Sequence, residues 1–171
     1  MGAMISSKPQ RLGRHFLVDH HSVRRRFSSQ ALKRIEDAIA AGERRHEGQV
    51  RFAVEASLPL GQILRGLEPR ARALELFGRL GVWDTEHNSG VLIYVLLADK
   101  DVEIVADRGI NRKVTQDTWQ AICRAMESAF REGRFEDGAI DGIAAVSELL
   151  AQHFPRGAAG PNELPDQAIV L

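Results

Sequence analysis

The segment that decides the fold is HNSGVLIYVLLADKDVEIVADRGI, residues His87–Ile110. It contains seven consecutive large apolar residues, Val91–Leu97, followed by the polar turn Ala98–Asp101. Because the apolar run lacks polar alternation and is rich in β-branched residues, it predicts a central strand covered on both faces. The turn is too short for a crossover connection, so Val102–Ala106 is predicted to be the antiparallel return strand of a hairpin.

The flanking sequence supplies a second strand and the helices that cover the sheet. Gln49–Ala56 alternates apolar and polar residues, with Val50, Phe52 and Val54 on one face, as a strand does. A helical pattern follows it from Pro69 to Leu80, so the central strand should run parallel to Gln49–Ala56 through a crossover. Further helices are predicted after the caps Ser28 or Ser29, Thr115 and Asp137. The expected fold is therefore α/β, a three-layer α/β/α sandwich whose small mixed sheet combines a parallel crossover with an antiparallel hairpin.

Length and composition indicate one globular domain. The chain has 171 residues, of which 44% are hydrophobic and 27% charged, an ordinary balance for a globular protein. Its one cysteine, Cys123, excludes an internal disulfide framework and is expected to be a small buried apolar residue. The longest apolar run, Val91–Ala98, is far shorter than the ~20 residues of a membrane span. With no apolar secretory signal at the start, we expect a soluble, cytoplasmic protein.

The N-terminal residues 1–26 form a basic amphipathic arm. The first 34 residues hold eight Lys and Arg against one Asp, although the whole chain has no net charge. A helix is predicted over Arg11–Phe27, with Leu12, Phe16 and Val23 on its apolar face. Such an arm can bind an anionic surface or pack on its own domain, and the need to cover both sheet faces favours packing. Nucleic acid is disfavoured because aromatic residues are few and do not alternate with the arginines.

Two further segments complete the domain boundaries. Residues 27–155 are predicted to be the folded domain, and residues 156–171 a flexible tail, because the latter are rich in Gly and Ala and contain two prolines.

The arm also carries His15, His20 and His21. These imidazoles are expected to be solvated rather than to bind a transition metal. The adjacent His20 and His21 would point about 100° apart on a helix and so would not converge on one ion.

The chain resembles the TPM domain family, named for its thylakoid-lumen, photosystem II repair and acetylcholine-receptor modulator members. The resemblance covers roughly residues 27–155. It rests on the Asn88-Ser89-Gly90 start of the apolar strand, the hairpin, the Asp107-Arg108-Gly109 segment after it, and the FREGRFEDG loop before the last helix. The chain differs in having Ser89 where many members have a second Asn, Asp107-Arg108-Gly109 where Gly-Tyr-Gly is common, and no membrane anchor.

The resemblance implies an α/β/α sandwich and a choice of functions. Some members bind divalent cations such as calcium, plant members show weak acid phosphatase activity, and many bacterial members are membrane-anchored or encoded beside membrane proteins. It therefore implies a non-catalytic, divalent-cation-binding interaction module with a membrane-associated or envelope protein partner. The alternatives are a weak metal-dependent acid phosphatase and anionic-surface binding through the basic arm. No nucleotide or organic cofactor is expected.

The predicted hairpin defines two rims of the sheet on which polar residues gather. At one rim, Asp84, Asn88 and Asp107 offer hard oxygen ligands suited to calcium, and Arg108 and Arg112 could bind an anion. The other rim gathers carboxylates from strand ends and from the last helix: Glu55, Asp99, Asp101 and Asp137. Ligands of open α/β sheets usually bind beyond the carboxyl ends of parallel strands, which favours the second rim. The loop residues shared with the family favour the first, which we take as the predicted site.

Two uses of the predicted site remain open. Asp84, Asn88 and Asp107 can bind a cation. Alternatively, Asp84 and Asn88 merely cap turns, while Asp107 pairs with Arg108 or another surface base. A phosphatase would need a metal-bound water or an activated nucleophile. No EF-hand loop, phosphate-binding P-loop or Gly-x-Ser-x-Gly motif occurs in the sequence, so no catalytic residue is assigned.

Overall fold

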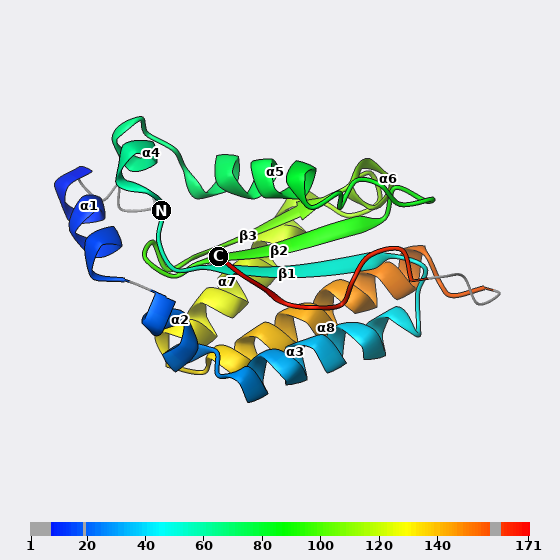
Figure 1. Cartoon of the computed structure of the whole chain (residues 1–171). Coiled ribbons are helices and arrows are strands. Elements are labelled where there is room, and N and C mark those ends of the chain that lie inside the picture. The colour runs from blue at the N-terminus through cyan, green and yellow to red at the C-terminus, as the bar shows by residue number, and fades with distance from the viewer. Residues whose placement is uncertain (1–7, 19, 158–161) are drawn as a thin grey trace.

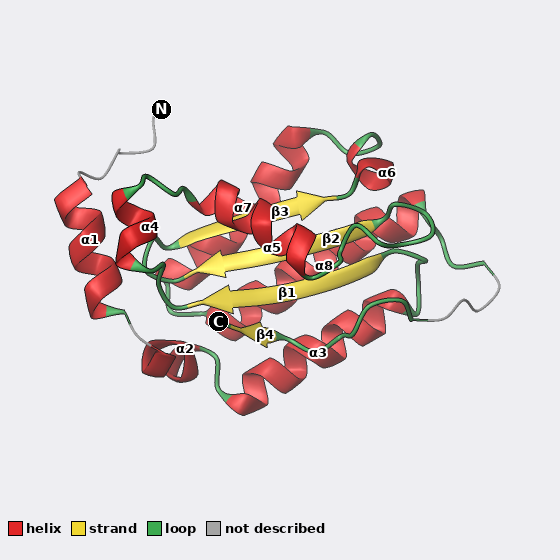
Figure 2. Cartoon of the chain, turned by 45° about the horizontal axis from the view of Figure 1, so that its top comes forward, coloured by secondary structure: helices red, strands yellow, loops and turns green. Residues whose placement is uncertain are grey.

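The computed structural model describes residues 8–18, 20–157 and 162–171, and its centre is an open four-stranded sheet in the order β3-β2-β1-β4. The strands are β1 (Gln49–Glu55), β2 (Gly90–Leu96), β3 (Asp101–Ala106) and β4 (Ile169–Val170). β1 runs parallel to β2 and to β4, whereas β2 and β3 form the antiparallel hairpin (Figure 2). The predicted α/β class, with a small mixed sheet, is confirmed.

Helices cover both faces of this sheet (Figure 1). They are α1 (Lys8–Leu17), α2 (His20–Arg26), α3 (Ser29–Glu43), α4 (Leu60–Leu64), α5 (Pro69–Arg79), α6 (Arg108–Asn111), α7 (Gln116–Arg131) and α8 (Phe135–His153). α3, α7 and α8 lie against one face, and α5 lies against the other. No helix within the described part of the chain is long and apolar enough to cross a membrane.

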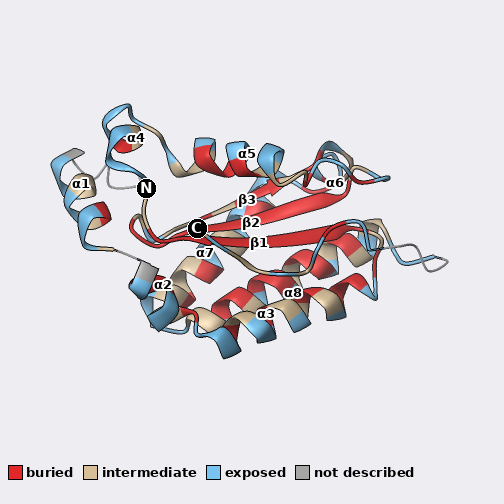
Figure 3. Cartoon of the chain, viewed as in Figure 1, coloured by how far each residue is buried: buried red, intermediate tan, exposed pale blue. Residues whose placement is uncertain are grey.

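The central strand divides its side chains between two cores. Val91, Ile93 and Val95 pack with residues of α3, α7 and α8, whereas Leu92 and Tyr94 pack with residues of α5. All seven residues of β2 are buried (Figure 3). Each large apolar side chain buried in this way contributes about 1.5–3 kcal/mol, so the absence of polar alternation follows from cover on both faces.

The helix caps agree with the sequence except in the last helix. Ser28 Oγ accepts a hydrogen bond from the Ala31 N–H, and Thr115 Oγ1 accepts one from the Thr118 N–H. Asp137 is not the cap of α8, because α8 begins at Phe135. Asp137 instead lies exposed in the first turn, where a carboxylate interacts favourably with the positive end of the helix dipole.

The basic arm folds as two helices, not one, and α1 packs on the domain (Figure 1). The prediction that His15 is solvated is wrong, because its side chain is fully buried. His15 Nδ1 accepts a hydrogen bond from the Leu58 N–H at 2.9 Å, and Nε2 lies 3.1 Å from Asp99 Oδ1. Arg11 joins them with Nη2 2.8 Å from Asp99 Oδ2. His21 is exposed, as expected, and the side chain of His20 lies outside the described residues.

The described part of the C-terminal segment lies along the domain, in contrast to the predicted flexible tail. β4 pairs with β1, and the Leu171 N–H donates to Val54 O at 2.9 Å. Gln49 Oε1 accepts hydrogen bonds from the backbone N–H groups of Glu163 and Leu164. The sequence did not predict this because a two-residue strand is too short to give a periodic signal.

A buried carboxyl links this segment to α3. Glu43 is 5% exposed, and its Oε1 accepts a hydrogen bond from the Val50 N–H at 2.8 Å. Burial, together with the charge of Asp166 and a hydrogen bond between the two side chains, raises the pKa of Glu43 from 4.5 to about 8. Glu43 is therefore mostly protonated at neutral pH.

We expect Glu43→Gln to flatten the stability profile between pH 4.5 and about 8. Because the folded-state pKa of Glu43 is raised, its contribution to stability is fully present below its unfolded pKa of 4.5 and is lost as pH rises through about 8. The substitution should remove this pH dependence, which amounts to about 5 kcal/mol for a pKa raised from 4.5 to about 8. Urea unfolding from pH 5 to 9 measures it; identical slopes in the two proteins would contradict the assignment.

Candidate functional site

The two loops of the predicted site lie side by side. The Asp107 N–H donates to Gly90 O at 2.8 Å, and the Gly109 N–H donates to Asn88 O at 2.9 Å. Asn88 adopts a left-handed conformation with φ of 51°, which turns its carbonyl toward the start of α6. The prediction that the hairpin brings residues 88 and 107 to one rim is confirmed by these contacts.

Glycine is required where the loops meet. A Cβ on Gly109 would lie 2.4 Å from His87 O and 2.5 Å from Asn88 O, well inside contact distance of rigid backbone atoms. A Cβ on Gly90 would lie 1.9 Å from Val82 O. These close approaches hold the rim together and explain both glycines without any ligand.

Asp107 is a buried carboxylate of the rim. It is 9% exposed, and its Oδ1 caps α6 by accepting a hydrogen bond from the Arg108 N–H at 2.7 Å. Its Oδ2 is buried and has no hydrogen-bond partner in the structure. A buried carboxylate oxygen without a partner carries a desolvation cost that a bound cation would offset.

The side-chain oxygen of Asn88 is a second possible cation ligand, but it already accepts a hydrogen bond from an arginine. Arg108 Nε donates to Asn88 Oδ1 at 2.9 Å. The Arg108 residue is exposed, so its side chain can move into solvent at small cost. A metal ion at this rim would therefore compete with the guanidinium for the amide oxygen.

The remaining predicted residues lie at the surface of the same region. Asp84 is exposed in a turn, with its N–H bonded to Gly81 O, and Arg112 is exposed at the end of α6. The described residues contain no group of three His, Cys, Asp or Glu side chains that could hold a metal ion. Asp107 and Asn88 thus fit a hydrated oxygen-bound cation, completed by water, rather than an ion enclosed by protein ligands.

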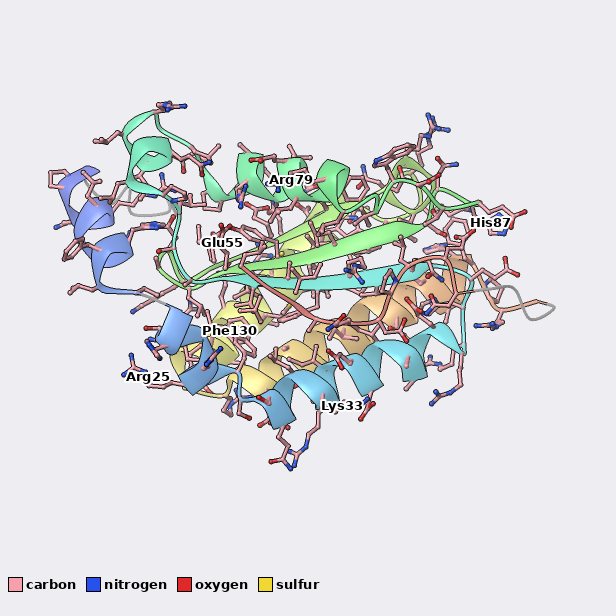
Figure 4. All side chains as sticks on the ribbon, viewed as in Figure 1. Arg25, Lys33, Glu55, Arg79, His87 and Phe130 are labelled. Carbon is pink, nitrogen blue, oxygen red and sulfur yellow. The ribbon has the colours of Figure 1, made fainter. Side chains whose placement is uncertain are left out.

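The second predicted rim does not form one site, because its carboxylates have separate partners. Glu55 is buried beneath α5, where Arg72 binds it through two hydrogen bonds of 2.9 Å (Figure 4). The Tyr94 hydroxyl donates to Glu55 Oε2 at 2.6 Å. Burial and this bond raise the pKa of Tyr94, and the bond to Glu55 raises the pKa of Arg72.

Asp99 and Asp101 lie at the hairpin turn but differ in charge state. Burial alone would raise the pKa of Asp99, but hydrogen bonds from His15 and Arg11 outweigh it and hold the pKa below its usual value. At Asp101 the charge of Arg11 has only a minor effect, and burial together with the nearby Glu103 raises the pKa to about 7. Asp137, on α8, takes no part in the contacts that hold Asp99 and Asp101.

Cys123 is the one thiol of the chain, and it is poorly suited to nucleophilic chemistry. It packs at the edge of the larger core. Burial and the nearby Glu103 raise its pKa to about 12, so it stays protonated at neutral pH. The predicted apolar environment agrees with this position, although Cys123 is only partly buried.

Comparisons with known proteins match this architecture. The TPM domain family matches residues 24–149. The structure is similar to the solution structure of BA42 from the psychrophilic bacterium Bizionia argentinensis, with 31% identity over 84% of this chain and 94% of that one, and a TM-score of 0.74. The N-terminal domain of a P. gingivalis protein shares the fold, with 18% identity, 76% and 82% coverage and a TM-score of 0.59. A comparison with curated proteins gave no match.

Proposed function

Since this chain belongs to the TPM domain family, we propose that it is a non-catalytic binding module that holds a divalent cation, such as calcium, at the rim formed by Asn88 and Asp107. The observation that carries the proposal is the buried Asp107 Oδ2, which lacks a partner beside the Asn88 amide. Asp107 would supply the charged ligand and Asn88 a neutral one. Water and Asp84 would complete the shell, and the bound ion would lend charge for engaging a membrane-associated or envelope protein.

A pair of single substitutions tests the cation. Asp107→Asn removes the only buried negative charge of the rim, so calcium affinity should fall at least about tenfold. Arg108→Gln removes the competing guanidinium from Asn88 Oδ1, so affinity should rise severalfold. Calorimetric titration of each protein with calcium, magnesium and zinc gives the affinities.

Arg112→Gln is the matched control, because Arg112 is exposed on the same short helix but makes no hydrogen bond to Asn88 within the described residues. We expect it to change calcium affinity less than Arg108→Gln does. If Arg108→Gln weakens binding, or if Asp107→Asn leaves it unchanged, the cation does not sit at this rim.

The two alternatives have weaker support. A metal-dependent phosphatase would use the same Asp107 with Arg108 and Arg112 as anion ligands, so a phosphomonoester assay of the calcium-loaded protein belongs in the same experiment. Anionic-surface binding through the arm would use the exposed Phe16 and Leu17 of α1. Against it, the same helix uses Arg11 and His15 to bind Asp99.

A further inference from the structure

A second cavity lies where the arm meets the domain, away from the Asn88 rim. Its volume is about 310 Å³, at the lower end of the range of small-molecule sites. It is lined by the last residues of β2, the hairpin turn, the C-terminal end of α7 and Arg26 at the end of α2. This is the carboxyl end of the parallel strands, where open α/β sheets bind their ligands.

Three cations from three segments line this cavity: Arg26, Lys100 and Arg131. The side chains of Lys100 and Arg131 make no hydrogen bond or ion pair with any other residue of the described ranges. One carboxylate, that of Glu127, also lines the cavity, and its Oε1 accepts a hydrogen bond from the Val102 N–H at 3.3 Å. The charged lining is therefore positive overall, and Lys100 and Arg131 can bind an anion, although the charge of Arg131 also acts on Glu127.

Two phenylalanines form the apolar wall. The rings of Phe130 and Phe135 stack with centroids 5.3 Å apart and an interplanar angle of 19°. The Arg26 guanidinium lies over the Phe135 ring at 5.6 Å and donates a hydrogen bond to Ser22 O, so its position is fixed. Figure 4 shows Phe130 beside α2, where the arm closes this end of the domain.

We propose that this cavity is a binding site for a small organic anion with a flat apolar group, an aryl carboxylate or an aryl phosphate. Lys100 and Arg131 bind the anionic group, and the ring packs against Phe130 and Phe135. Arg26 completes the wall, so binding also strengthens the docking of α2. The site is separate from the proposed cation site, and neither proposal depends on the other.

Benzoate and phenyl phosphate are the probes. Two controls accompany them: benzyl alcohol, which has the ring without the charge, and inorganic phosphate, which has the charge without the ring. We expect saturable amide shifts confined to residues 95–100, 127–135 and the end of α2, with a dissociation constant of about 1 mM for the better aryl anion. Arg131→Gln should weaken binding about tenfold. Arg124→Gln is the matched control, since Arg124 lies two turns earlier on α7 and is equally exposed, and it should change affinity less than about twofold.

Four results would each overturn the proposal. They are no saturable shift with either aryl anion, shifts spread over every basic surface, equal binding of benzyl alcohol or inorganic phosphate, and equal weakening by Arg131→Gln and Arg124→Gln. Binding of one aryl anion in preference to the other supports the site and identifies its ligand class. The amide spectrum of Arg131→Gln without ligand verifies that the variant is folded.

Discussion

Arg72→Ala should lower the free energy of unfolding by about 3–5 kcal/mol, the usual cost of leaving one member of a buried ion pair alone. The Arg72 and Glu55 side chains are 9% and 7% exposed, and two hydrogen bonds of 2.9 Å join them. Without the guanidinium, Glu55 keeps a buried charge with only the Tyr94 hydroxyl to stabilise it. Urea unfolding at neutral pH measures the loss.

The comparison variant is Arg79→Ala on the same helix. Arg79 is 65% exposed and pairs with Glu75 at 3.4 Å, so its removal should cost less than about 0.5 kcal/mol. Adding Glu55→Gln to Arg72→Ala removes the stranded charge and should recover part of the stability. A loss below about 1 kcal/mol for Arg72→Ala would mean that water reaches the pair, contrary to the structure.

Asp99→Ala should release α1 at a cost of about 3 kcal/mol in docking free energy, because it removes the buried carboxylate that Arg11 and the buried His15 share. The loss should be local. Amide protons of α1 should exchange faster, while those of β1 and β2 keep their protection. Hydrogen exchange followed residue by residue measures both. The pKa of Asp99 is depressed, so this contribution is present above the unfolded pKa of 3.8 and is lost as pH falls through the lower folded value.

Glu68→Gln provides the matched test of this contact. Glu68 also binds Arg11, at 3.3 Å, but its side chain is 71% exposed, so its neutralisation should leave exchange in α1 nearly unchanged. Equal acceleration in the two variants would show that Asp99 is not the anchor of the arm. Unchanged exchange in Asp99→Ala would show that apolar packing alone holds α1.

The sheet was predictable from sequence because its strands differ in pattern for a physical reason. Val91–Leu97 is apolar throughout, whereas Gln49–Ala56 alternates although β1 is equally buried, because Glu55 of β1 has a buried partner in Arg72. The turn between residues 97 and 102 is too short for a crossover, so it predicted a hairpin. In a hairpin the start of β2 lies beside the end of β3, which predicted that Asn88 and Asp107 lie close together. β4 was not predicted, because its two residues form a strand by pairing with β1 and have no sequence pattern of their own.

The polar contacts were less predictable, because they depend on side chains far apart in sequence. Glu55 was assigned to an open rim, yet Arg72, which neutralises it, comes from α5 and gave no signal of its own. Arg11 and His15 did carry a signal. They lie four residues apart on one face of a helix, which suits two donors that converge on one carboxylate. Asp107 was predicted as a ligand, but its role as the cap of α6 was not.

Paramagnetic broadening by manganese tests the proposed cation site most directly, because Mn²⁺ prefers oxygen ligands and erases the amide signals of residues near it. We predict that trace Mn²⁺ first erases the signals of residues 88–90 and 107–110, and that excess calcium restores them. Erasure centred instead on Asp101, Glu103 and Glu127, where burial raises the pKa of each carboxyl, would contradict it. That result would move the cation to the opposite end of β3.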